Sequence, residues 1–174
     1  MDHHGPLKLL LFLGCAGIGL AACSQSHDTQ QSAVLTELQA LKTSGKLPAL
    51  DTTASITGTD ANKNGVRDDL DTIIAAQTDL PVQRAALTQM AQAIQATLTL
   101  DTTNATAVSA VATQVSRAVA CVFAQYTTGN AGGRVTWIQE LSINTMPRLL
   151  AYQQFNNAMN DSVTGVETGA VCNG

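Results

Sequence analysis

The sequence is short of histidine, of aromatic residues and of clustered basic residues. All three histidines, His3, His4 and His27, fall near the start, and the chain beyond position 27 has none. That distribution removes the usual general base, the common zinc ligand and the familiar histidine-containing catalytic triads. Aromatic residues make up only 3% of the chain, and its formal net charge is −4. Without a basic patch or stacked aromatic residues, nucleic acid is not expected as a partner.

The first 22 residues have the pattern of a secretory signal. The apolar run LLLFLGCAGIGL, at 9–20, follows a short polar lead and is far too short to span a bilayer as a helix. At its end stands Leu20-Ala21-Ala22-Cys23, a leucine and two small residues before a cysteine. This segment resembles the lipobox of bacterial lipoproteins, in which the cysteine is acylated and becomes the first residue of the mature chain.

The lipobox resemblance implies a cellular location. It implies that residues 1–22 are removed, that lipid on Cys23 attaches the chain to a membrane, and that 23–31 form a flexible tether. Ser24, in place of an aspartate after the cysteine, implies the outer membrane by the same resemblance, facing the periplasm or the cell surface. An ordinary signal peptide and an uncleaved anchor are the alternatives.

Two cysteines remain once the N-terminal region is set aside. Cys15 lies in the signal and Cys23 at the lipidation position, which leaves Cys121 and Cys172. An even pair in an oxidising compartment predicts a disulfide. That bond would hold the C-terminal tail on a helix 51 residues earlier (172 − 121). Two unrelated buried thiols are the alternative.

Beyond position 32, apolar residues recur three and four positions apart, which is the spacing of amphipathic helices. With breaks at TGNAGG (128–133) and at Pro147, the pattern predicts helices near 32–41, 82–98, 108–122, 135–145 and 149–159, and a short helix from Leu70. We expect an all-α fold, a compact bundle of about five or six helices in one domain, 32–174. An irregular tail from Asn160 to Gly174 would be pinned by the disulfide.

Residues 60–71, DANKNGVRDDLD, space their oxygen-bearing side chains like a calcium loop inserted between the first helix and the Leu70 helix. Gly65 stands at position 6 of the EF-hand pattern, where the chain turns tightly. Position 8 is Arg67 instead of an apolar residue, and position 12 is aspartate instead of glutamate. In these two respects the stretch resembles the calcium loops of thrombospondin type 3 repeats, although asparagines replace their aspartates at positions 3 and 5. The expected ligands, at positions 1, 3, 5, 7, 9 and 12, are Asp60, Asn62, Asn64, Val66 through its carbonyl, Asp68 and Asp71.

The loop predicts one calcium ion as a cofactor. Because only three side chains are carboxylates, the affinity should be modest, about 10⁻⁴–10⁻³ M as in extracellular modules. Magnesium is the alternative ion, although it prefers fewer protein ligands and more water. Without any metal, Asn64-Gly65 is a tight turn and Asp68 or Asp69 caps the helix that follows. That interpretation explains the turn and one aspartate, but not the whole set.

No catalytic group of residues emerges from the spacing. Glu37, Glu140 and Glu167 are scattered, and Trp137 and Tyr152 lie on helical stripes typical of a core. The pattern favours a non-enzymatic envelope protein in which calcium fixes a surface for an unidentified protein partner or for a structural role. A carboxylate-type envelope hydrolase and an inhibitor or immunity protein stay open as alternatives.

Overall fold

The computed structural model describes residues 36, 40, 49–127, 129–160 and 170–173. The expected signal, Cys23, the tether, nearly all of the predicted helix at 32–41 and much of the tail lie outside these residues. From residue 49 onward the described residues belong to one structural unit, 48–174. The fold of that unit is described below.

Within the described residues of this unit, the regular secondary structure consists of five helices. They are α2 (Asp68–Ala75), α3 (Pro81–Thr99), α4 (Ala105–Gln125), α5 (Ala131–Ser142) and α6 (Met146–Met159). The all-α prediction is confirmed, and so is the packing of the helices into a bundle. Local sequence sets the helix starts. Asn104 and Asn130 accept the N–H groups of Ala107 and Gly133 as N-caps of α4 and α5, and a proline lies in the first turn of both α3 and α6.

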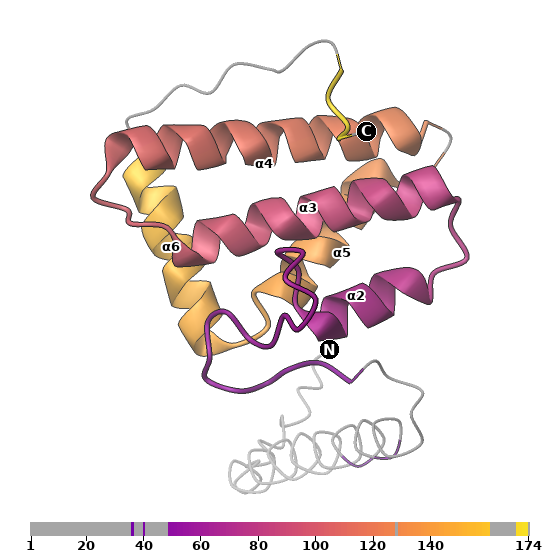
Figure 1. Ribbon diagram of the computed structural model, residues 1–174, viewed down its shortest axis with the longest axis horizontal. Coiled ribbons are helices and arrows are strands. Elements are labelled where there is room, and N and C mark those ends of the chain that lie inside the picture. Colours follow the sequence, from indigo (N-terminus) through magenta and orange to yellow (C-terminus); the bar gives the residue numbers. More distant parts are fainter. Residues whose placement is uncertain (1–35, 37–39, 41–48, 128, 161–169, 174) are drawn as a thin grey trace, which may run out of the picture. The chain divides into compact units, whose positions relative to one another are not determined.

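The central element is α3, which packs against each of the other four helices. Figure 1 shows α3 and α4 side by side and running in opposite directions. In the same view α6 crosses the end of this pair where α3 ends and α4 begins, and it contacts both helices. Because α3 is covered on several sides, its buried residues form the middle of the core, among them Leu87, Met90 and Ile94.

Helix α4 buries a different face from the one that its valines predict. Of the stripe expected along this helix, Val108 and Val122 are buried, but Val115 and Val119 are only half-buried. The small residues Ala112, Ala118 and Cys121 face the core in their place. Small side chains let two helices approach closely, and the displaced valines line an apolar groove between α4 and α6. By length and composition α4 could also cross a membrane, but it packs against α3, α5 and α6 as part of the bundle.

The predicted disulfide is present. The Sγ atoms of Cys121 in α4 and Cys172 in the tail are bonded, and the two Cα atoms lie 4.9 Å apart. Val171 and Cys172 pack against the main core, so the tail contributes side chains to it as well as a covalent link. The side chain of Gln125 also lies 3.5 Å from the sulfur of Cys172.

Removing the disulfide should lower stability substantially. The bond closes a loop with a sequence separation of 51 residues. The loss of loop-closure entropy in the unfolded chain then corresponds to about 4 kcal/mol of unfolding free energy. We expect the double variant Cys121→Ala/Cys172→Ala to unfold at a correspondingly lower urea concentration. Reductant should destabilise the natural chain and leave the double variant unchanged. Equal urea midpoints for the two proteins would contradict this role of the bond.

Candidate metal-binding loop and its anchors

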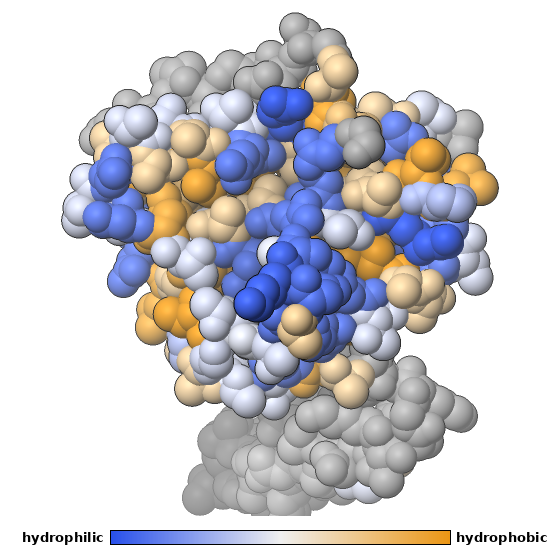
Figure 2. Space-filling model, in the orientation of Figure 1, coloured by the Kyte–Doolittle hydropathy of each residue, from blue (hydrophilic) through white to orange (hydrophobic). Residues whose placement is uncertain are grey.

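The loop at 60–71 lies against the middle of α3 and runs directly into α2. The Gln92 side chain donates to the Asn64 carbonyl at 2.8 Å, and Gln95 donates to the Thr57 carbonyl at 3.3 Å. Figure 2 shows hydrophilic residues gathered over this loop, in front of α3. Val66 turns the other way, since its side chain is fully buried in the core. The loop is therefore held at its middle by one apolar side chain and by the Gln92 hydrogen bond, and Gln95 holds the segment just before it.

Hydrogen bonds to the backbone give the loop its tight turn. The carboxylate of Asp60 accepts the N–H groups of Asn64 and Gly65 at 3.1 and 2.9 Å. Asn62 accepts the N–H of Asn64 at 3.0 Å, and Asn64 accepts the N–H of Val66 at 2.8 Å. Gly65 has a φ of +83°, a left-handed conformation that glycine adopts without strain. Gly65 therefore makes the tight turn that the calcium-loop pattern requires at position 6.

Two of the predicted ligands converge on a carboxylate oxygen of a third. Asn62 and Asn64 donate their Nδ2 hydrogens to Oδ2 of Asp71, at 2.9 and 2.8 Å. Asp68 accepts the N–H of Ala61 at 3.0 Å, which ties the start of α2 back to the start of the loop. Asp71 therefore accepts from both asparagines, whereas the carboxylates of Asp60 and Asp68 accept backbone N–H groups within the loop.

The chemistry of this set fits a hard cation on one condition. Among the described residues, no three Asp, Glu, His or Cys side chains form a metal-binding group, so any ion here would depend on amide and backbone oxygens as well. The Asn62 and Asn64 amides now direct nitrogen toward Asp71. A half-turn of each amide exchanges nitrogen for oxygen within almost the same shape. That rotation would break the bonds that their oxygens accept from the backbone, so the residues fit a metal only after the two amides turn.

Neither Asp68 nor Asp69 caps α2, contrary to the metal-free interpretation of the sequence. The N-cap position is Arg67, which makes no side-chain capping bond, and both aspartates lie in the first turn of the helix. Their negative charges still favour that end of the helix dipole. The Asp68 side chain is used by Ala61 instead, and that of Asp69 binds Arg67 and the Asp51 N–H.

Arg67 fastens the end of the loop to α5. Its side chain is only 1% exposed, and it forms a two-pronged ion pair with Asp69 through Nε and Nη2, at 2.9 and 2.8 Å. It also donates to the carbonyls of Ser142 and Leu141, at 2.9 and 3.2 Å, at the C-terminal end of α5. A cation there satisfies carbonyls that the helix leaves unpaired. The residue that departs from the EF-hand pattern is thus the one that anchors the loop.

Arg148 fastens the segment before the loop to α6. Its guanidinium is fully buried and donates to the carbonyl and carboxylate of Asp51, at 2.6 and 3.1 Å, and to the carbonyl of Ile56, at 3.3 Å. Asn144 supports it by accepting one of its N–H groups and by donating to the Asp51 carbonyl. The Asp51 N–H in turn donates to Asp69 at 2.9 Å, so the two arginines belong to one network.

Gly58 lets the chain pass over this network. A Cβ atom at Gly58 would lie 2.4 Å from Cδ of Arg67 and 2.8 Å from the carboxylate of Asp51, closer than atoms can pack. The residue also has a φ of +66°, which disfavours any side chain. Space and backbone conformation therefore both require glycine beside the arginines.

The network shifts the pKa values of its members. Burial acts to raise the pKa of Asp69, but hydrogen bonds from Arg67 and the Asp51 N–H outweigh it and the net pKa is lowered. The pKa of Asp51 is lowered by hydrogen bonds from Thr53 and by Arg148. Burial and the nearby charge of Arg67 lower the pKa of Arg148, although an arginine stays protonated under any ordinary condition.

The aromatic residues singled out in the sequence support the bundle. Trp137 and Tyr152 are half-buried against the core, and Glu140 is exposed on α5. Arg134 lies over the rings of Tyr126 and Trp137, 5.6 and 5.5 Å from their centres, and pairs with Asp79 at 2.9 Å. Burial, and then the hydrogen bond to Asp79, raises the pKa of Tyr126 to about 12. These contacts fasten α3 to α4 and α5.

Replacing Arg148 should destabilise the domain far more than replacing an exposed arginine. Arg148→Met removes the buried donor that binds the Asp51 carboxylate and the carbonyls of Asp51 and Ile56, and these oxygens are left with fewer hydrogen bonds. Loss of one partner of a buried pair costs about 3–5 kcal/mol, and the lower end applies because Asp51 keeps some access to water. Urea unfolding at neutral pH measures the change, and Arg117→Met on α4 is the control, with an expected effect of about 0.5 kcal/mol or less. Similar losses for both variants would show that the network contributes little.

Acid should weaken the network only at a pH below that at which exposed acidic residues take up protons. The pKa values of Asp51 and Asp69 lie below their ordinary value of 3.8 in the folded chain, so the folded state binds fewer protons than the unfolded state. Their contribution is therefore complete above that value and is lost as the pH falls below it, through the folded-state pKa. Urea unfolding over a pH series should show this fall, flattened in Asp69→Asn and preserved in Glu140→Gln. If the unfolding free energy of both variants falls equally with pH, the acid sensitivity comes from other residues.

The sequence does not reveal the network in advance. Arg67 was visible only as an exception to a loop pattern, and Arg148, Asp51 and Asn144 carry no signal by their spacing. Comparison with known proteins adds no relative, because no family model, curated protein or solved structure matches the chain. The arrangement is a loop of oxygen-bearing side chains on a helical bundle, and its function has to be argued from these residues alone.

Proposed function

We propose that the chain is an envelope lipoprotein whose helical domain carries a structural calcium loop and serves a binding or structural role. The lipobox Leu20-Ala21-Ala22-Cys23 supports the lipid anchor and the outer-membrane address, on its sequence alone. The disulfide agrees with an oxidising compartment. The observation that carries the calcium proposal is the convergence of Asn62 and Asn64 on the Asp71 carboxylate, inside a loop that Asp60 and Gly65 close.

In this proposal some loop residues bind the ion and others shape the turn. Carboxylate oxygens would come from Asp60, Asp68 and Asp71. Asn62 and Asn64 would add amide oxygens once their amides turn, and Val66 would add its carbonyl. The ion supplies positive charge that offsets the repulsion among three carboxylates. Asparagines in place of two aspartates keep that repulsion low enough for the loop to close by hydrogen bonds when no ion is bound.

The place of the loop suggests what a bound ion would achieve. On one side, Arg67 already fixes the end of the loop to α5, and Val66 fixes it to the core. The opposite side, from Ala61 to Asn64, is exposed and is held mainly by hydrogen bonds within the loop. Calcium would stiffen that exposed side and so present a defined polar surface in front of α3. A partner that contacts this surface would bind the calcium-bound protein more tightly than the calcium-free protein.

Millimolar calcium should raise the thermal unfolding midpoint of the purified protein. At an affinity near 10⁻⁴ M, a tenfold excess of ion stabilises the folded state by about 1.4 kcal/mol, which corresponds to about 3–6 °C for a domain of this size. Magnesium should give a smaller rise, and EDTA should abolish both. Differential scanning fluorimetry is sufficient to measure these shifts.

A charge-matched pair of variants tests where the ion binds. Asp71→Asn removes the carboxylate on which the loop converges, and the calcium-dependent shift should disappear. Asp101→Asn removes one negative charge from the exposed turn between α3 and α4 and should keep the full shift. Because each shift is measured against the same variant in EDTA, a change in basal stability does not affect the comparison. No shift in the natural chain, or an equal shift in both variants, rules out calcium at this loop.

A further inference from the structure

A second site lies between α3, α4 and the C-terminal tail. It is a cavity of about 320 Å³, near the lower end of volumes for small-molecule pockets. Among the described residues, its lining is polar apart from one alanine and includes no acidic side chain. The residues that line it are Gln89, Gln92, Ala93, Gln114, Arg117 and Asn173.

The C-terminal tail forms one wall of this pocket. Hydrogen bonds to the nearly buried side chain of Gln89 hold it in place. Gln89 donates to the Val171 carbonyl at 2.9 Å and accepts the N–H of Asn173 at 2.8 Å. The Cys121–Cys172 disulfide lies between these two contacts in the tail. Gln89 therefore uses both its amide nitrogen and its amide oxygen to hold the wall. The pocket is built as part of the fold and exists only where the tail is docked.

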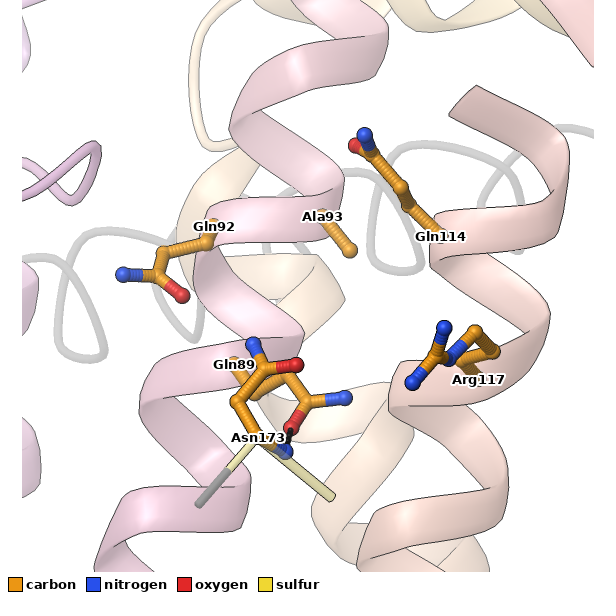
Figure 3. A pocket seen from close by; sticks show the side chains of 6 residues that line it. All are labelled: Gln89, Gln92, Ala93, Gln114, Arg117 and Asn173. Atoms are coloured by element: carbon orange, nitrogen blue, oxygen red, sulfur yellow. Dashed lines mark hydrogen bonds between the residues drawn. The ribbon is translucent and has the colours of Figure 1, made fainter. Parts of the chain in front are cut away.

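Among the described residues that line the pocket, Arg117 carries the only charge. It is also the only charged residue in the 21 residues of α4, and within the described residues it makes no ion pair. One of its N–H groups reaches the Ala170 carbonyl at 3.3 Å. A guanidinium has five N–H donors, so most of them are left for a bound anion. Figure 3 shows Arg117 extending from α4 into the space that separates it from α3.

Two amides add hydrogen-bonding groups of both kinds. Gln114, one turn before Arg117, points into the same space in Figure 3, and Asn173 lies across its lower end. Within the described residues neither side chain has a hydrogen-bonding partner, whereas Gln92 points away from α4 and is bound to the loop. Each free amide offers a donor and an acceptor, which is the complement of a peptide group. A single cation beside two such amides matches a ligand that carries a carboxylate next to an amide.

We propose that this pocket binds the carboxylate end of a short peptide. The carboxylate would lie on the Arg117 guanidinium, which pairs with carboxylates through two parallel N–H bonds. Gln114 and Asn173 would bind the last amide group. The proposal goes beyond the calcium loop and does not depend on it, because none of the three binding residues belongs to that loop. Because the tail forms part of the pocket and the disulfide holds the tail on α4, binding should require the disulfide.

The experiment is a calorimetric or NMR titration of the oxidised protein in EDTA with N-acetyl-alanyl-alanine. The free acid should bind, and the same dipeptide with a C-terminal amide should bind at least about tenfold more weakly, because it lacks the charge. Arg117→Gln should weaken binding of the free acid by a similar factor. Lys63→Asn, which removes a positive charge from an exposed left-handed position outside the pocket, should leave binding unchanged.

Two further measurements separate this site from a general attraction to anions. Inorganic phosphate should compete poorly, since it lacks the amide group, and Gln114→Ala should reduce the preference for the peptide without removing the charge. The proposal is overturned if the acid and the amide bind equally or not at all, if phosphate competes as well as the peptide, or if Arg117→Gln and Lys63→Asn behave alike. An unchanged thermal midpoint for Arg117→Gln shows that any loss of binding is local.

Discussion

Two buried guanidinium groups hold the irregular part of this domain on its helices. The segment from Ala49 to Arg67 has no regular secondary structure, so its backbone makes few of the hydrogen bonds that a helix supplies for itself. Arg67 and Arg148 compensate by binding carbonyls at the end of α5 and within the segment, and each pairs with an aspartate. Desolvating two positive charges is costly, and the structure offsets the cost with several bonds to each group. The loop, the start of α2 and the junction of α5 with α6 all depend on that arrangement.

The helices could be predicted because periodicity is a local property. The runs around α3, α4 and α6 repeat at helical spacing, and Asn104 and Pro147 mark starts that the structure also has. The buried face of α4 could not be predicted from its valines, since the choice between valine and alanine at a contact depends on how close the neighbouring helix lies. The disulfide followed from counting cysteines, because only two remained for an oxidising compartment. What failed was the helix cap, where Asp68 and Asp69 were drawn into tertiary contacts.

The oxygen-bearing residues of the loop could be predicted, but the directions of their groups could not. Spacing alone places Asp60, Asn62, Asn64, Asp68 and Asp71 around one turn. In the structure each of them makes hydrogen bonds within the loop, and both asparagines bind Asp71. An asparagine, unlike an aspartate, can turn either an oxygen or a nitrogen toward the centre. Calcium at this loop stays a prediction, since the same five residues already have hydrogen-bonding partners within the loop. The arginine anchors were invisible for a different reason: their partners are distant in sequence, and one buried charge leaves no periodic signal.

The disulfide encloses two complete helices in a covalent ring. Both α5 and α6 lie between Cys121 and Cys172 in the chain, so the ring cannot close until each of them has emerged. A protease that cuts the backbone once inside this ring leaves a nicked molecule in one piece, still joined through sulfur and through the core contacts of Val171. A cut in the exposed turn at 60–65 has no such safeguard and parts the chain into two. The two parts of this domain therefore differ in how much cleavage of the backbone they survive.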